Sequence, residues 1–131
     1  MSLKHSVILV YPDTKMEMPS AYQLPLSVLS VAATLYEEFD VDIYDERVQS
    51  RDVYLSFLDK KPIAVGISSM TGAQITNGIE LSQLAKDRNI PTIWGNWHAT
   101  LVPEQTLEHP FIDYVVTHEG ELAFRSLIKE I

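Results

Sequence analysis

The apolar runs Val7-Ile8-Leu9-Val10 and Ile63-Ala64-Val65-Gly66-Ile67 decide the fold of this 131-residue chain. Neither run alternates apolar with polar side chains, as a strand with one solvated face would. An unbroken apolar run is typical of a strand in a parallel sheet, because helices cover both faces of such a sheet. We therefore predict buried β-strands over residues 5–11 and 63–67.

Segments with helical spacing separate these strands. The pattern predicts one helix over about residues 24–38 and another over about residues 73–88, with Asn89 as an acceptable C-terminal residue. Ser50 is the expected cap of a further helix, because its hydroxyl can accept a hydrogen bond from the first turn. The apolar face of that helix would be formed by Val53, Tyr54, Phe57 and Leu58.

Further short strands and a final helix complete the alternation. Strands are expected over residues 41–44, 91–94 and 114–116, and a short helical turn over residues 103–107. The last helix is indicated by apolar residues at i, i+3, i+4 and i+7, which are Phe124, Leu127, Ile128 and Ile131. Alternating buried strands and helices predict an α/β Rossmann-like three-layer sandwich. Its five-stranded parallel sheet would have the flavodoxin-like order 2-1-3-4-5 with helices on both faces, in one domain spanning residues 1–131.

The composition excludes several classes of function. The net charge of −8 argues against a nucleic acid partner, because binding to polyanions needs a cationic surface. No apolar run approaches the length of a membrane span, and we expect a cytoplasmic protein. The chain has no cysteine, so it cannot form a disulfide, a thiolate zinc site or a cysteine-held iron–sulfur cluster.

In a sheet of this order, ligands bind beyond the carboxyl ends of the strands. Four segments follow those ends, at residues 11–23, 68–72, 95–101 and 117–121. The segment Ser68-Ser69-Met70-Thr71-Gly72 offers hydroxyl and backbone N–H groups to a polar ligand, although capping of the next helix is the more common role of such residues. Both roles remain open for this segment.

The segment Trp94-Gly95-Asn96-Trp97-His98-Ala99-Thr100 follows the fourth strand. Gly95 would let a ligand approach the backbone closely, and Trp97 offers a flat apolar wall; a tight turn with a packed Trp97 is the alternative. After the fifth strand, Glu119 and Glu121 favour a helix N-terminus. We expect no protein-held metal, because nothing brings His98, His109, His118, Glu119 and Glu121 together.

The motifs of the common ligands of this fold are absent. The chain contains neither the dinucleotide fingerprint G-x-G-x-x-G after its first strand nor the P-loop motif. A response-regulator receiver needs an aspartate at the end of the third strand, where this chain has Ser68-Ser69. Residues 11–15 do not resemble the hydroxyl-rich loop of a flavodoxin, and no nucleophile elbow is present.

Several stretches together resemble one family, the N-terminal cobalamin-binding domain of class B radical S-adenosylmethionine (SAM) enzymes. They are Leu24-Pro25-Leu26-Ser27, Val65-Gly66-Ile67-Ser68-Ser69-Met70-Thr71-Gly72, Trp94-Gly95-Asn96-Trp97-His98-Ala99-Thr100-Leu101, Ile112-Asp113-Tyr114-Val115-Val116 and Glu119-Gly120-Glu121. The resemblance implies that cobalamin lies beyond the strand ends, with its corrin at the segment after the first strand and its nucleotide tail near residues 68–72 and 95–100. It implies contacts from Tyr11, Pro12, Ser68, Ser69, Met70, Thr71, Gly72, Gly95, Asn96, Trp97, His98, Ala99, Thr100, Glu119 and Gly120.

The chain departs from related patterns at informative positions. The methionine-synthase branch has D-x-H-x-x-G after the first strand, whereas here Lys15 stands where its cobalt-binding histidine falls. The resemblance therefore implies base-off cobalamin without a protein histidine ligand. Asn96 and His118 replace glycines that relatives often carry, which adds bulk beside the expected site.

The resemblance also implies partners outside this chain. A domain cut from a longer enzyme would precede a radical SAM barrel, which would hold SAM and a [4Fe-4S] cluster and carry out the reaction. Methyl transfer, or the anaerobic cyclisation of Mg-protoporphyrin IX monomethyl ester, is the expected class of parent reaction. Two alternatives remain: an interaction domain that has lost the cofactor, and a flavin or nucleotide binder that uses Trp94 and Trp97 for stacking.

Overall fold

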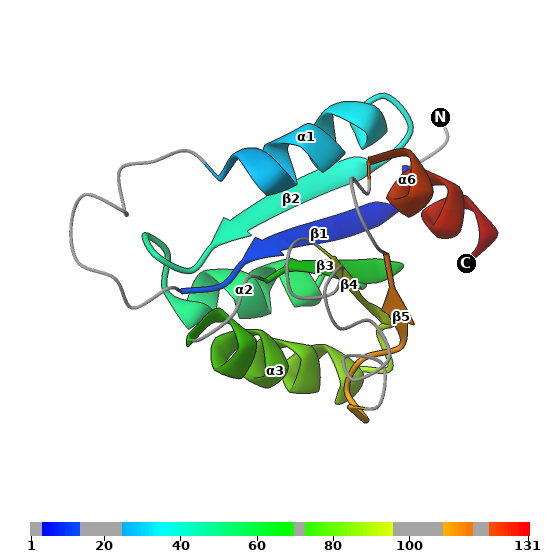
Figure 1. Cartoon of the computed structure of the whole chain (residues 1–131). Helices are drawn as coiled ribbons and strands as arrows, with labels where there is room; N and C mark the ends of the chain where they lie inside the picture. The colour runs from blue at the N-terminus through cyan, green and yellow to red at the C-terminus, as the bar shows by residue number, and fades with distance from the viewer. Residues whose placement is uncertain (1–3, 14–24, 70–72, 96–108, 117–120) are drawn as a thin grey trace.

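A computed structural model describes residues 4–13, 25–69, 73–95, 109–116 and 121–131. It is a three-layer α/β sandwich around a five-stranded, all-parallel sheet with the order β2-β1-β3-β4-β5, which confirms the predicted fold class and strand order (Figure 1). The elements are β1 (Ser6–Tyr11), α1 (Leu26–Leu35), β2 (Asp40–Asp45), α2 (Arg51–Leu58), β3 (Ala64–Ser68), α3 (Ala73–Lys86), β4 (Thr92–Gly95), β5 (Tyr114–Val115) and α6 (Glu121–Glu130).

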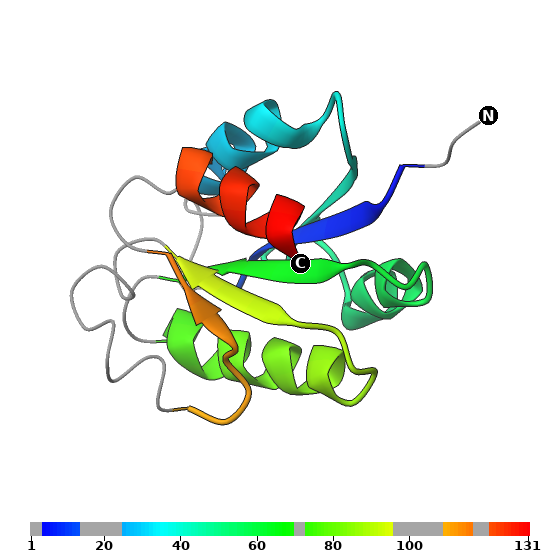
Figure 2. The ribbon, with the colours of Figure 1, turned by 90° about the vertical axis from the view of Figure 1, so that its right-hand side faces the viewer.

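The two apolar runs form the middle of the sheet. In β1, Val7 and Leu9 point into a core with α1 and α6, whereas Ile8 and Val10 point into a second core with α2 and α3. All four side chains are buried because the alternation of a strand sends them to two faces that are both covered. Figure 2 shows α1 and α6 together on one side of the sheet and α2 and α3 on the other.

The observed helix ends differ from the expected ones in two places. Helix α1 covers Leu26–Leu35 rather than residues 24–38, and it begins after Pro25, which occupies the N-cap position. The expected side-chain cap at Ser50 is wrong: Ser50 is the N-cap of α2, but its hydroxyl makes no capping hydrogen bond. The Ser50 carbonyl accepts a hydrogen bond from Val53 N at 3.1 Å, so the donor that a hydroxyl would take is already used.

The other boundaries agree closely with the sequence pattern. Helix α3 ends at Lys86, and the following turn reaches Asn89 with φ of 59°, a left-handed conformation that asparagine tolerates. Strand β5 is one residue shorter than residues 114–116. The turn expected at residues 103–107 lies outside the described residues. None of the helices in the described ranges combines the length and apolar character needed to cross a membrane.

Gly66 of β3 is required by packing. A Cβ added to Gly66 would lie 2.7 Å from Cε2 of Phe124 and 3.1 Å from Cδ2 of Leu9. The first separation is too short for any real Cβ, so the ring of Phe124 from α6 lies directly against the backbone of the central sheet. This contact connects the last helix to the middle of the fold.

We predict that Gly66→Ala lowers the free energy of unfolding by about 1–3 kcal/mol, because the new methyl group must displace the Phe124 ring. Urea denaturation measures this loss. Phe124→Leu removes the clashing ring atoms, so the loss caused by Gly66→Ala should be clearly smaller in the Phe124→Leu background. Additive effects of the two substitutions would contradict the assigned contact.

Candidate ligand-binding site

The carboxyl ends of the strands bring two sequence-predicted residues side by side. Ser68 ends β3 and Gly95 ends β4, and the two are register partners in the sheet. Strand alternation directs Ser68 to the α1 side, because Val65 and Ile67 point to the opposite face. By the same alternation, Gly95 shares a face with Ile93, which packs in the core under α1 and α6. Tyr11 of β1 also packs against that core, so all three lie on one face at one edge.

Hydroxyl groups meet at this edge. The Oγ atoms of Ser27 in α1 and Ser68 are 2.8 Å apart and share a hydrogen bond. Ser68 is buried, and Ser69 is completely buried with its backbone N–H donating to the Gly95 carbonyl at 3.3 Å. The Ser69 N–H is therefore already hydrogen-bonded to the protein backbone. The Ser27–Ser68 pair is a polar contact between α1 and the sheet.

Gly95 differs from Gly66 in its surroundings. Among the described residues, a Cβ added to Gly95 would meet only the Val116 carbonyl oxygen, at 3.6 Å, which is an ordinary van der Waals distance. Contact with these neighbours therefore does not require a glycine at this position. With respect to the described residues, the Gly95 backbone is open beside a hydroxyl pair, an arrangement that suits a ligand passing close to the sheet edge.

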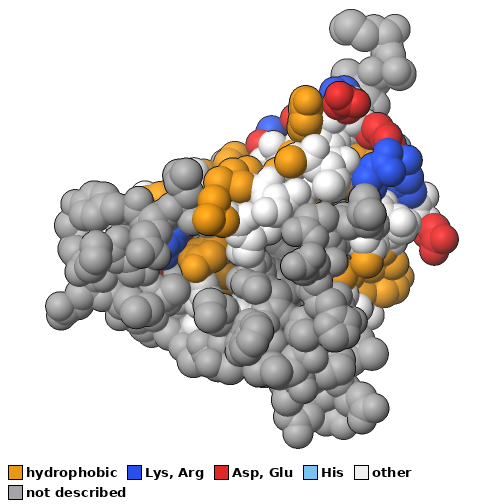
Figure 3. Space-filling view, turned by 45° about the horizontal axis from the view of Figure 1, so that its top comes forward, with side chains coloured by type: hydrophobic (Ala, Val, Ile, Leu, Met, Phe, Trp, Pro, Cys, Tyr) orange, Lys and Arg blue, Asp and Glu red, His pale blue; other side chains and the backbone are white. Residues whose placement is uncertain are grey.

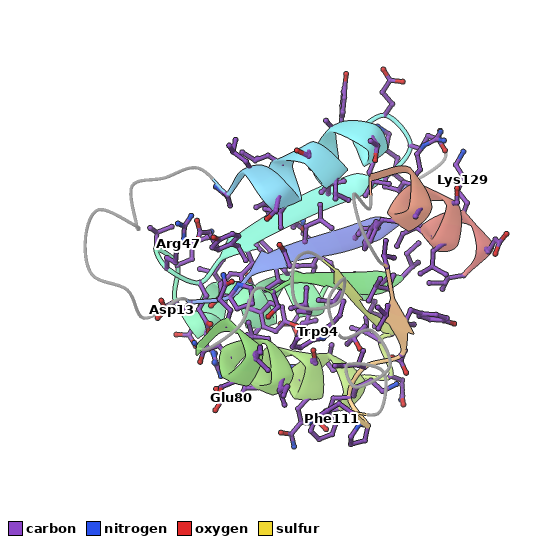
Figure 4. The ribbon with its side chains drawn as sticks, in the orientation of Figure 1. Asp13, Arg47, Glu80, Trp94, Phe111 and Lys129 are labelled. Carbon is purple, nitrogen blue, oxygen red and sulfur yellow. The ribbon has the colours of Figure 1, made fainter. Side chains whose placement is uncertain are left out.

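Tyr11, the last residue of β1, lies beside the ion pair of Arg47 and Asp45. The guanidinium carbon of Arg47 lies 4.3 Å from the centre of the Tyr11 ring. The Asp45 carboxylate accepts two hydrogen bonds from the Arg47 guanidinium, from Nε at 2.9 Å and from Nη2 at 2.8 Å. This pairing raises the pKa of Arg47 above its usual range, so the side chain is a permanent cation. Figure 4 shows Arg47 and Asp13 near each other where β1 and β2 end.

Three residues that the sequence analysis did not single out hold Pro12 and Asp13. Gln74 Nε2 donates to the Pro12 carbonyl and Asn77 Nδ2 to the Asp13 carbonyl, both at 2.9 Å. Glu46 Oε1 accepts the Asp13 N–H at 3.0 Å. A sequence signal existed for the two amides, since they are polar residues at i and i+3 on the helix side that continues into the buried Leu81 and Ala85.

Trp94 is not available to a ligand. It is completely buried under α3, and its indole Nε1 donates to Ser82 Oγ at 3.0 Å (Figure 4). Its ring lies against Gly78, where an added Cβ would be 3.0 Å from Cη2 of Trp94. The expectation that Trp94 stacks on a flavin or nucleotide is therefore wrong, because β4 directs this side chain into the α2/α3 core.

Many expected site residues lie outside the described residues, and their predicted roles stay predictions. These are Lys15, Met70, Thr71, Gly72, Asn96, Trp97, His98, Ala99, Thr100, His118, Glu119 and Gly120. The part of the chain that the structure describes contains no group of three or more histidine, aspartate or glutamate residues able to hold a metal ion.

The fold defines a class: a doubly wound α/β domain, the kind of domain that generally binds ligands beyond the carboxyl ends of its strands. Residues 20–128 match the B12 binding domain family. This match covers most of the chain, and the chain therefore belongs to the B12 binding domain family, as the sequence resemblance implied.

Relatives and solved structures agree with this assignment. An uncharacterized methyltransferase of Pyrococcus horikoshii, PH0819, is 32% identical over 93% of this chain. The fold matches the cobalamin-dependent SAM radical enzyme OxsB with a TM-score of 0.81 at 24% identity over 97% of the chain. It matches the radical SAM methyltransferase TsrM of Kitasatospora setae with a TM-score of 0.77 at 20% identity over 96% of the chain. The chain spans 28%, 19% and 25% of these three proteins, respectively.

Tyr44, which precedes Asp45 at the end of β2, gives a pH-dependent prediction. Burial, and next the negative charge of Glu46, raises the pKa of Tyr44 from 10.0 to about 12. Because the unfolded chain releases this proton first, the free energy of unfolding should fall as the pH rises from about 10 to 12.

Denaturation midpoints measured across this pH range check the prediction. Tyr44→Phe should make the decline shallower, whereas Tyr36→Phe, at an exposed tyrosine, should leave it unchanged. Equal slopes for the parent chain and Tyr44→Phe would show that Tyr44 does not contribute.

Proposed function

We propose that residues 1–131 bind cobalamin at the carboxyl edge of the sheet, as the accessory domain of a longer radical SAM enzyme. The match of residues 20–128 to the B12 binding domain family carries this proposal. The site geometry supports it, because Ser68 and Gly95, which were selected from the sequence alone, are register partners at the edge where such folds bind ligands.

The described residues suit the parts of this cofactor. The nucleotide tail is long and carries both polar and apolar groups, so it needs hydroxyl partners and close backbone approach. Ser27 and Ser68 supply the hydroxyls, and Gly95 leaves the backbone open on the same face. Tyr11 and Pro12 would lie towards the corrin. We include Ser69, Met70, Thr71, Gly72, Asn96, Trp97, His98, Ala99, Thr100, Glu119 and Gly120 in the proposed contact set.

We propose a base-off cobalamin with no histidine from this chain on the cobalt. Lys15 occupies the position at which a methionine-synthase-like domain has its ligand. When bound, cobalamin supplies a cobalt centre that carries and releases an alkyl group. The residues of this chain would bind and orient the cofactor and shield it from water, and none of them would be a catalytic residue.

The names of two relatives suggest the class of reaction that we propose for the longer enzyme. Because PH0819 and TsrM are named as methyltransferases, we propose methyl transfer as the class of reaction. The cyclisation of Mg-protoporphyrin IX monomethyl ester is the second candidate reaction. The chain has no cysteine, so a [4Fe-4S] cluster and its SAM would have to be held by a downstream barrel.

Apolar surface beside the site supports a covering partner. Leu26, next to Ser27 at the start of α1, is 67% exposed, and Val48 after β2 is 63% exposed. Figure 3 shows apolar side chains at the surface of the molecule. We propose that the barrel of the parent enzyme covers this edge and completes the pocket.

The direct test is retention of cobalamin. The purified chain, mixed with hydroxocobalamin and passed through a gel-filtration column, should elute with a base-off absorbance spectrum. A colourless protein peak would contradict the proposal for this chain and favour the alternative of an interaction domain without cofactor. A spectrum that shows nitrogen ligation of the cobalt, either by a histidine or by the cofactor's own benzimidazole, would overturn the proposed ligation while leaving cobalamin binding intact.

Gly95 provides the matching mutation. We expect Gly95→Leu to lower cobalamin affinity at least about tenfold, since the side chain would fill the space through which the tail passes. Ser56→Leu places the same bulk on the exposed side of α2, in the opposite layer, and should retain the affinity of the parent chain. Titration followed by absorbance measures both. Unchanged binding by Gly95→Leu would show that the tail passes elsewhere.

A further inference from the structure

The first residues after β1 contact a helix on one face of the sheet, although the chain then leads to a helix on the opposite face. The segment after β1 leads to α1, which covers one face of the sheet, yet its first residues are bound by α3, which covers the other face (Figures 1 and 2). The contacts join residues 62 and 64 positions apart in the sequence. They lie where β1 and β3 are neighbours and their following helices diverge, which is the switch point of the sheet.

The side chains that make these contacts are buried and come from two different elements. Gln74 is 2% exposed and Asn77 is 6% exposed, so both amide groups have been removed from water. The Glu46 side chain, from the segment after β2, is 9% exposed and also binds Arg51 Nε at 2.7 Å through its second oxygen. Glu46 is further fixed from its backbone, because its N–H donates to the Tyr11 carbonyl at 3.0 Å.

Together these contacts determine the orientation of two consecutive peptide groups. Gln74 binds the Pro12 carbonyl, Asn77 binds the Asp13 carbonyl, and Glu46 binds the Asp13 N–H. A single hydrogen bond would leave a peptide free to rotate, whereas bonds to consecutive groups from opposite sides do not. Because the amides are buried, a carbonyl that lost its donor would have to be satisfied by water or movement of the chain.

We propose that Glu46, Gln74 and Asn77 are positioning residues that fix the backbone of Pro12 and Asp13 where these two residues would face the corrin. This inference rests on the proposed cobalamin function. None of the three would touch the cobalt; each would act through Pro12 or Asp13. A site that already has its bound conformation loses less conformational entropy when the cofactor binds. These hydrogen bonds would therefore strengthen cobalamin binding although none of them is made to the cofactor.

A matched pair of substitutions at Glu46 tests the hydrogen bond itself. Glu46→Gln and Glu46→Leu both remove the charge that faces Arg51, but only glutamine keeps an oxygen able to accept the Asp13 N–H. We expect Glu46→Leu to weaken cobalamin binding about tenfold and Glu46→Gln to retain most of the affinity. Binding is measured by absorbance titration of the 131-residue chain with hydroxocobalamin.

A second variant tests the contribution of α3. Asn77→Leu removes the donor to Asp13, and Tyr54→Phe is its control, because Tyr54 donates a buried hydrogen bond at 2.8 Å to the Leu81 carbonyl of the same helix and not to Pro12 or Asp13. Both substitutions should lower the free energy of unfolding. Only Asn77→Leu should also weaken binding and change the electron paramagnetic resonance spectrum of the bound Co(II) form, which reports axial ligation.

The outcomes separate this inference from the function on which it rests. A parent chain that fails to bind cobalamin contradicts the proposed function and removes the basis of the inference. A parent chain that binds, with Glu46→Leu equal to Glu46→Gln, or Asn77→Leu equal to Tyr54→Phe in affinity and spectrum, overturns the positioning role alone. Weaker binding by Glu46→Leu and Asn77→Leu, with an altered Co(II) spectrum, supports it.

Discussion

The structure depends on the burial of β1 and β3 from both sides. Their side chains alternate between two cores, so each strand needs a helical layer above and below it. Parallel pairing then places the ends of β1, β3 and β4 at one edge, where Ser68 and Gly95 are register partners. The candidate site is a consequence of this constraint: its residues meet because their strands must be buried together.

The sequence could predict the architecture because local patterns carry it. Unbroken apolar runs mark the buried strands, and apolar residues at helical spacing mark the helices between them. Successive residues of a strand point to opposite faces of the sheet. Because Trp94 and Gly95 are adjacent in β4, the sequence could have predicted that Trp94 points away from the face on which Gly95 lies. The contacts of Gln74 and Asn77 could not be predicted in this way, because they join atoms more than sixty positions apart and depend on how α3 is placed over the sheet.

Glycines illustrate the same limit within the site. The sequence singles out Gly95, which ends an apolar strand, but it gives no sign of the packing role of Gly66, which lies inside another. In the structure, Gly66 lies against the Phe124 ring, whereas Gly95 meets only the Val116 carbonyl oxygen among the described residues. The packing role of Gly66 is decided by the element that crosses it, which is α6.

The contact between Phe124 and Gly66 also determines how late one core of the domain can form while the chain is being synthesised. Leu9 and Gly66 leave the ribosome before α6, and Phe124 and Ile128 can complete their core only after the residues of α6 have emerged. Until then, α1 is the only described helix of its layer that can cover this face, while the α2/α3 face can already close. This half-covered nascent sheet is the stage at which the chain is most exposed to aggregation and to chaperones.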